Sequence, residues 1–204
     1  MFQQRIRAII PVLLFSVACS EAPVAKKKAP EKPPEPISAR HAFQNMFAAA
    51  RTWAPDAQVV QLQSYPIADV KEKDGLYGAW VASFASPSRM KLKTWSYSVV
   101  EAGGNFHKGV FAGHEESFSG TRGQAKPFLA AALRIDSDEA FQTASKKATD
   151  YMAKHPDMRI SYLLELTPRF PDPAWRIMWG ESVSSSTYSV FVDATTGLFL
   201  TTVR

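Results

Sequence analysis

Residues 137–167 read SDEAFQTASKKATDYMAKHPDMRISYLLELT, and the spacing of the apolar residues changes within this stretch. Up to Lys154 they recur every three or four positions, which is the period of an amphipathic helix. Ser137 can cap the start of this helix, and Pro156 ends it. Over residues 158–167 apolar and polar residues alternate, as in a half-buried strand. The stretch therefore predicts a helix that leads into a strand, the unit of an α+β fold.

The same arrangement occurs where the folded part of the chain begins. Ser38 can cap a helix that Pro55 ends. The apolar stripe of this helix consists of Ala42, Phe43, Met46, Phe47, Ala50 and Trp53, and that of the later helix of Ala140, Phe141, Ala144, Ala148, Tyr151 and Met152. Each helix needs a second layer to cover its stripe, and a sheet can provide that layer.

Four short matches relate the two parts of the chain to one another. They keep the same order at offsets of 98, 101, 95 and 91 residues, which is typical of a duplicated unit with loop insertions. The pairs are Ala42-Phe43 with Ala140-Phe141, Pro55-Asp56 with Pro156-Asp157, Ala79-Trp80 with Ala174-Trp175, and Tyr97-Ser98-Val99 with Tyr188-Ser189-Val190. We therefore expect two similar modules, residues 38–123 and 124–204, each an amphipathic helix packed on a three- or four-stranded antiparallel sheet.

Further strands are expected in each half. They cover residues 77–85, 90–101, 174–180, 187–193 and 198–200. Gly197 ends a tight turn before the last of these strands, at a position that needs a positive φ. The duplication also predicts that Trp80 and Trp175 are both buried, each beneath its own helix.

A family resemblance follows from the second half. Residues 135–141, IDSDEAF, with the helix that they start, Trp175, and residues 190–200, VFVDATTGLFL, resemble a PepSY domain. The resemblance covers about residues 135–204 and reaches the first half through the internal repeat. It implies a small extracytoplasmic, cystatin-like module that binds a partner or inhibits a peptidase rather than an enzyme. The matched residues shape a turn and transfer no active site, and residues 102–105, AGGN, replace that turn in the first half.

The first 18 residues have the composition of a secretory signal peptide. Arg5 and Arg7 precede an uncharged run of eleven residues, which is too short to span a bilayer. We therefore exclude residues 1–18 from the fold.

The only cysteine of the chain directly follows this segment. Residues 16–19, SVAC, resemble the lipobox at which bacterial lipoproteins are cleaved and diacylated, with serine where that family usually has leucine. The resemblance implies that a lipid, with palmitate among its fatty acids, is attached to Cys19. This lipid would anchor the chain in the membrane. Ser20 after the cysteine implies the outer membrane, on its periplasmic side. Ordinary cleavage after residue 22 is the alternative, although Pro23 would then follow the cut.

Residues 19–37 are expected to form a tether. They contain five prolines and three consecutive lysines but no aromatic residue, so they cannot bury enough apolar surface to fold. The whole chain has a net charge of +5, but from Ser38 onward 18 basic residues face 16 acidic ones. This balance gives no electrostatic support for nucleic-acid binding, and no nucleic-acid partner is expected.

One cluster in the sequence has the residue types of a metal site. His107, His114, Glu115 and Glu116 supply two imidazoles and two carboxylates in a glycine-rich stretch. Their spacing matches no established metal motif, and solvated loop residues are the competing interpretation. No serine lies in a Gly-x-Ser-x-Gly motif, and the glycines fit no nucleotide-binding pattern, so we assign no catalytic residue and no cofactor.

Surface recognition is the remaining class of function. Six aromatic residues lie in or near the loops and edge of the first half, where they are either binding anchors or core: Tyr65, Tyr77, Trp95, Phe106, Phe111 and Phe118. A free sheet edge could also pair with an extended peptide. We expect a non-catalytic envelope lipoprotein that binds a protein or peptide partner, with peptidase inhibition as one such role. The alternatives are a metal-dependent hydrolase built on the histidine cluster and a structural envelope spacer.

Overall fold

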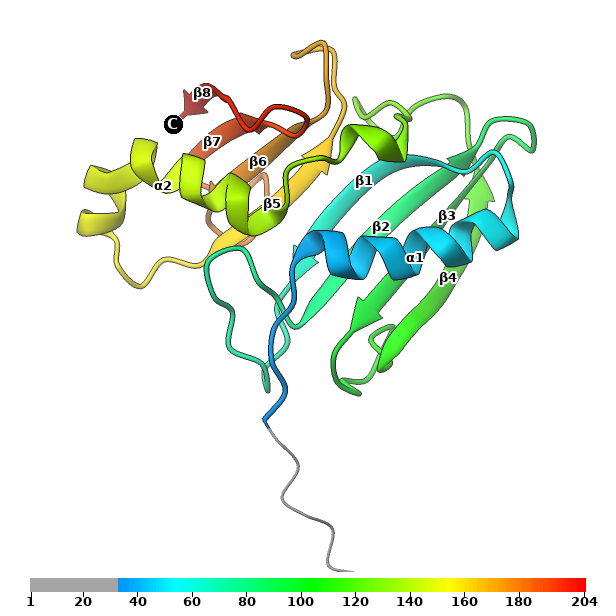
Figure 1. Ribbon diagram of the computed structural model, residues 1–204, viewed down its shortest axis with the longest axis horizontal. Coiled ribbons are helices and arrows are strands. Elements are labelled where there is room, and N and C mark those ends of the chain that lie inside the picture. The colour runs from blue at the N-terminus through cyan, green and yellow to red at the C-terminus, as the bar shows by residue number, and fades with distance from the viewer. Residues whose placement is uncertain (1–32) are drawn as a thin grey trace, which may run out of the picture. The chain divides into compact units, whose positions relative to one another are not determined.

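Figure 1 shows the computed structural model, which describes residues 33–204. In chain order the elements are α1 (Ala39–Trp53), β1 (Gln58–Tyr65), β2 (Ala79–Ser86), β3 (Lys91–Ser98), β4 (Gly109–Ser117), the short 3₁₀ helix η1 (Ala130–Ala132), α2 (Ser137–Lys154), β5 (Ile160–Glu165), β6 (Ala174–Trp179), β7 (Tyr188–Asp193) and β8 (Phe199–Val203). Within the described residues no helix has the length and apolar character needed to cross a membrane. The predicted signal peptide, Cys19 and most of the predicted tether lie outside them.

Both helices lie close to their predicted positions. The side chain of Ser38 caps α1, as predicted, and accepts a hydrogen bond from the His41 N–H at 3.4 Å. The cap of α2 is Asp136, one residue before the predicted Ser137, and it forms a reciprocal capping box with Glu139. Each helix ends two residues before the proline that was expected to stop it.

The sheet differs from the sequence prediction. All eight strands form one antiparallel sheet in the order β4-β3-β2-β1-β5-β6-β7-β8, so the expectation of two modules, each with its own sheet, is wrong. In separate modules β1 and β5 would be edge strands with unpaired backbone N–H and C=O groups. Here residues 61–63 pair with residues 163–165, and Leu62 lies opposite Leu164 in the core. This pairing removes both edges at once.

A single apolar core fills the space between the helices and the sheet. Both helices cover the same face of the sheet (Figure 1), α1 over the first four strands and α2 over β6 and β7. The largest fully buried side chains of this core come from both halves of the chain and include Trp80, Phe84, Met46, Leu62, Tyr162, Leu164, Trp175, Ile177 and Trp179. The core therefore runs across the middle of the sheet without interruption.

Two tryptophans occupy matching places in this core. The indole N–H of Trp80 donates to the Ile37 carbonyl at 3.0 Å, and that of Trp175 donates to the Ile135 carbonyl at 2.9 Å. Both side chains are 0% exposed, so their predicted burial is confirmed. Their ring centroids are 6.4 Å apart, so the two rings share one core, although Trp80 lies on a strand that α1 covers and Trp175 on a strand that α2 covers.

Two strands were not predicted. In β1 the register shifts between Val59 and Gln61, which breaks the alternation by which a strand is identified. In β4, Gly109 and Gly113 together with four polar residues gave the pattern of a loop. Local periodicity therefore missed the central strand β1 and the edge strand β4.

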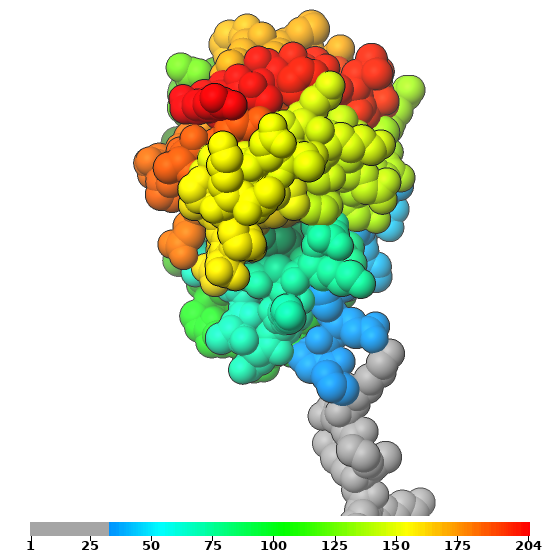
Figure 2. Space-filling model, turned by 90° about the vertical axis from the view of Figure 1, so that its left-hand side faces the viewer, coloured from blue at the N-terminus to red at the C-terminus, as the bar shows by residue number. Residues whose placement is uncertain are grey.

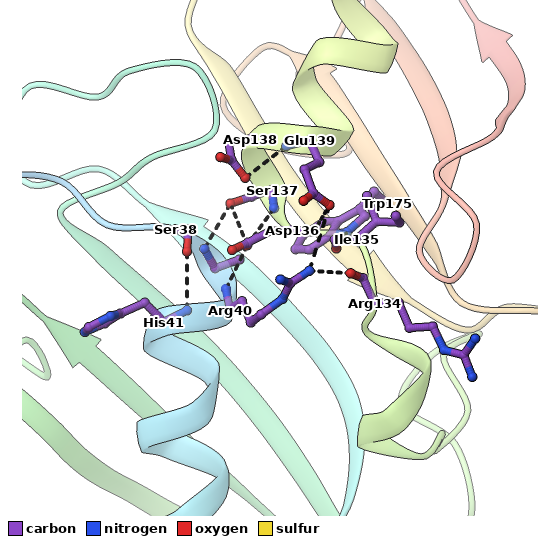
Figure 3. A network of polar contacts seen from close by, with 11 residues as sticks. Ser38, Arg40, His41, Arg134, Ile135, Asp136, Ser137, Asp138, Glu139 and Trp175 are labelled. Carbon is purple, nitrogen blue, oxygen red and sulfur yellow. Dashed lines mark hydrogen bonds and ion pairs between the residues drawn. The ribbon is translucent and has the colours of Figure 1, made fainter.

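The N-terminal ends of the two helices meet (Figure 3). One oxygen of the Asp136 carboxylate accepts hydrogen bonds from the backbone N–H groups of Ser137 at 2.7 Å and Arg40 at 2.9 Å. The Ser137 hydroxyl accepts a further bond from the Ala39 N–H at 2.9 Å. Because helix N-termini carry partial positive charge, a single carboxylate here stabilises both helices and joins the two halves.

Candidate functional site

The face of the sheet opposite the helices, called here the helix-free face, is only partly covered. Two small apolar clusters lie on it. One consists of Val60, Ala85, Leu92, Phe118 and Ala125, and the other of Ile67, Val70 and Ala79. Two adjoining hollows of the uncovered surface lie beside these clusters.

The first hollow lies where β1 and β5 separate. Their pairing ends at Gln63 and Leu163, although β1 continues to Tyr65. Beyond that point the Tyr162 N–H donates to the Ser64 hydroxyl at 3.0 Å instead of to a strand carbonyl. The hollow has a volume of about 560 Å³, within the range of small-ligand sites.

Aromatic, hydroxyl and charged groups line this first hollow together. Burial raises the pKa of Tyr77 and of Tyr162, so both phenols stay neutral, and the Tyr77 hydroxyl donates to the Ile160 carbonyl. The guanidinium of Arg159 lies 3.2 Å from the Glu181 carboxylate and 3.8 Å from that of Glu72. The hollow thus offers neutral hydrogen-bonding groups beside a cation whose charge is already compensated.

The second hollow lies over β2, β3 and β4 and has a volume of about 430 Å³. Val81, Thr94 and Ser96 lie on its sheet side. Arg122 reaches the hollow from the segment after β4 and donates to the hydroxyl of Ser83, which lies 3.0 Å from the Thr94 hydroxyl. These contacts hold the Arg122 guanidinium against β2 and β3.

The two hollows adjoin one another. Gln63 and Tyr65 line both of them. Tyr65 is 43% exposed, and its ring stacks on Phe106 with the centroids 4.1 Å apart. We call the two hollows and this shared aromatic rim the groove.

Some of the six aromatic residues singled out in the sequence line the groove. Tyr65, Phe106 and Phe111 line the second hollow. Trp95 and Phe118 are buried, so for these two the core interpretation was correct. Tyr77 combines the two roles, because it is 3% exposed and yet lines the first hollow.

The predicted metal cluster is divided between different surroundings. His107 lies 2.5 Å from the Glu101 carboxylate, and Glu115 accepts a hydrogen bond from the Trp53 indole at 2.7 Å. That indole bond, with nearby cations, lowers the pKa of Glu115, and the Lys108 N–H, followed by His107, lowers that of Glu101. His114 and Glu116 line the second hollow. Among residues 33–204, no group of three or more histidine, cysteine, aspartate or glutamate residues could hold a metal ion.

Sequence reasoning missed several residues of the groove. Gln63, Ser64, Arg122 and Arg159 carry no motif, and they meet because β1 lies beside β5 and because the segment after β4 folds back over the sheet. The one local signal was the Tyr65-Pro66 pair, since a proline marks the end of a strand.

The fold resembles that of a solved bacterial protein. A crystal structure of a proposed lipoprotein from Clostridium difficile 630 superposes with a TM-score of 0.50 at 12% sequence identity, covering 85% of this chain and 95% of that one. Comparisons of the sequence with protein-family models and with curated proteins give no match. At this identity the likeness establishes a shared fold.

Proposed function

We propose that this chain is a lipid-anchored protein of the bacterial cell envelope that binds an extended polypeptide in the groove and catalyses no reaction. The lipid anchor is supported by the lipobox that ends at Cys19 and by the structural likeness to a proposed lipoprotein. The serine that follows Cys19 favours the periplasmic side of the outer membrane.

The observation that carries the binding function is the exposed Tyr65 ring on the wall shared by the two hollows. Side chains on one face of an extended chain recur about every 7 Å, so neighbouring side chains can occupy adjoining hollows. Exposed tyrosine rings are common anchors in protein interfaces because they bury a large rigid surface. The hydroxyl and amide groups around them can bond the partner's backbone.

An inhibitory role is one form that such binding can take. A protein that holds an extended segment without cleaving it can block a peptidase whose own loop occupies the groove. This role depends on the identity of the partner, which the cross-linking experiment below provides.

Site-specific photo-cross-linking in intact cells tests the binding function. A photoreactive amino acid at Tyr65 should give a discrete cross-linked polypeptide. The matched control replaces Leu129, which is 68% exposed and lies outside the lining of both hollows, and should give none. Equal cross-linking at both positions, or none at Tyr65, would contradict the proposal and favour a spacer role. Cleavage of the captured polypeptide by the purified protein would contradict the absence of catalysis.

The anchor is tested separately by Cys19→Ser. Metabolic labelling with a fatty-acid analogue should mark the natural chain and leave the variant unlabelled, because the thiol is the proposed acceptor. Unchanged label on the variant would show that the lipid is attached elsewhere.

A further inference from the structure

The two edges of the sheet differ in how well they resist pairing with another strand. The β4 edge carries His114, Glu115 and Glu116, and these polar and charged side chains discourage strand addition. Both edge strands have a register shift against their neighbours, so the shift does not distinguish the two edges. The opposite edge, β8, reads FLTTV and contains no charge, glycine or proline. Such a strand is a good template for backbone pairing.

The β8 edge lies open on the surface. Phe199, the first residue of β8, is 37% exposed, and Leu198 directly before it is 66% exposed. Figure 2 shows this C-terminal strand, in red, as a continuous band on the surface above α2, in yellow. The edge is therefore accessible to an incoming strand.

Cations flank β8 on both faces of the sheet. On the helix-covered face, Lys147 lies 4.9 Å over the Phe199 ring, and Arg204 lies 5.8 Å over Tyr188. On the helix-free face, Arg169 and Arg176 lie 4.7 and 5.5 Å over the ring of Phe191, which pairs with Thr201 of β8.

These cations lack close carboxylate partners. None of them forms an ion pair within 4.0 Å inside residues 33–204. Desolvation lowers the pKa of Arg176, the negative charge of Glu165 opposes this, and repulsion from Arg169 adds a smaller lowering. The surroundings of β8 therefore favour a negatively charged partner.

We propose that β8 pairs with an extended acidic polypeptide segment, which adds one more strand to the sheet. Neighbouring strands lie about 4.8 Å apart, so side chains of the added strand come within reach of Lys147 on one face and of Arg169 on the other. Backbone hydrogen bonds would supply affinity, and carboxylates on the segment would supply selectivity. This surface is separate from the groove and goes beyond the proposed function.

The positive charge around β8 also favours an acidic segment over a second copy of the chain as the partner. Antiparallel pairing of two β8 strands about a two-fold axis would place the helix-covered faces side by side. Lys147 and Arg204 of both copies would then gather near the axis, where they repel one another. An acidic segment compensates the same charges.

The test uses two synthetic peptides with capped ends, one of valine and glutamate and the other with lysine in place of glutamate. Binding to the purified chain is measured by fluorescence anisotropy, and amide hydrogen exchange locates the contact. The glutamate peptide should bind and protect amides of β8, and the lysine peptide should not. Lys147→Glu should weaken binding by about tenfold or more. The control Lys146→Glu makes the same charge change one position away on α2 and should bind as the unmodified chain does.

Three outcomes would overturn the proposal. They are equal binding of the two peptides, protection at the groove instead of at β8, and equal effects of the two lysine substitutions. Protection of β8 without peptide, together with a concentration-dependent dimer in sedimentation, would assign the edge to a second copy instead.

Discussion

At the scale of single residues, Asp56 shows how one carboxylate joins two turns. It accepts hydrogen bonds from the Ser86 hydroxyl at 2.7 Å and from the Ser88 N–H at 2.8 Å. These bonds, that of Ser86 first, lower the pKa of Asp56 to about 2. The turn after α1 is thereby fixed to the turn between β2 and β3.

The depressed pKa of Asp56 predicts a pH dependence of stability. A carboxylate whose pKa is lower in the folded state stabilises the fold above its unfolded pKa of about 4, and this contribution is lost as the pH falls towards 2. As the pH is lowered from about 4 to 2, the free energy of unfolding should therefore fall less for Asp56→Asn than for the natural chain. Denaturant unfolding at several pH values measures the difference. Ser86→Ala should raise the Asp56 pKa in an NMR titration, and an unchanged titration would contradict this cause.

At the scale of secondary-structure elements, the junction of the two helices depends on Asp136. Asp136 is 9% exposed, and its carboxylate accepts hydrogen bonds from backbone N–H groups of both helices (Figure 3). Ser38 caps α1 alone, through a longer bond of 3.4 Å. The two caps therefore differ in how many helix ends they serve.

Substitution of each cap should show this difference. Loss of a helix cap typically costs about 1 kcal/mol, and Asp136→Ala should cost about 2 kcal/mol or more because both helices lose an acceptor. Ser38→Ala should cost about 0.5–1 kcal/mol. Both values come from denaturant unfolding of the purified chain. Equal losses for the two variants would mean that Asp136 does not join the helices.

How far the sequence predicts the fold depends on whether the information is local. Both helices, six of the strands and the positive φ of Gly197, +76°, could be predicted because caps, prolines and periodicity are properties of neighbouring residues. The pairing of β1 with β5 could not be predicted from the sequence, because it depends on which unpaired strand edges come together in the folded chain. The sequence did not predict the groove. It singled out some of the lining residues, such as Tyr65 and His114, whereas Arg122 and Gln63 reach the groove by tertiary folding alone.

At the scale of the whole molecule, the continuous sheet should make residues 33–204 unfold as one unit. The Trp80 and Trp175 rings come from different halves of the chain and meet edge to face, 6.4 Å apart and inclined by 70°. Aromatic contacts of this kind contribute about 0.5–1.5 kcal/mol beyond the area that they bury. Two independent modules would have no such coupling between their cores.

A double-mutant cycle measures this coupling. Trp80→Ala and Trp175→Ala should each cost about 3–5 kcal/mol, because each leaves a cavity and removes the indole donor of a partly buried carbonyl. The double variant should differ from the sum of the two by about 0.5 kcal/mol or more, with one unfolding transition throughout. The control cycle pairs Trp175 with Trp95, whose ring contacts are Trp53 and Phe84, and should be additive. If the double alanine variant does not fold, Trp→Phe substitutions keep the cycle measurable. Additive losses in the Trp80–Trp175 cycle, or two separate transitions, would mean that the halves behave as independent units despite their shared sheet.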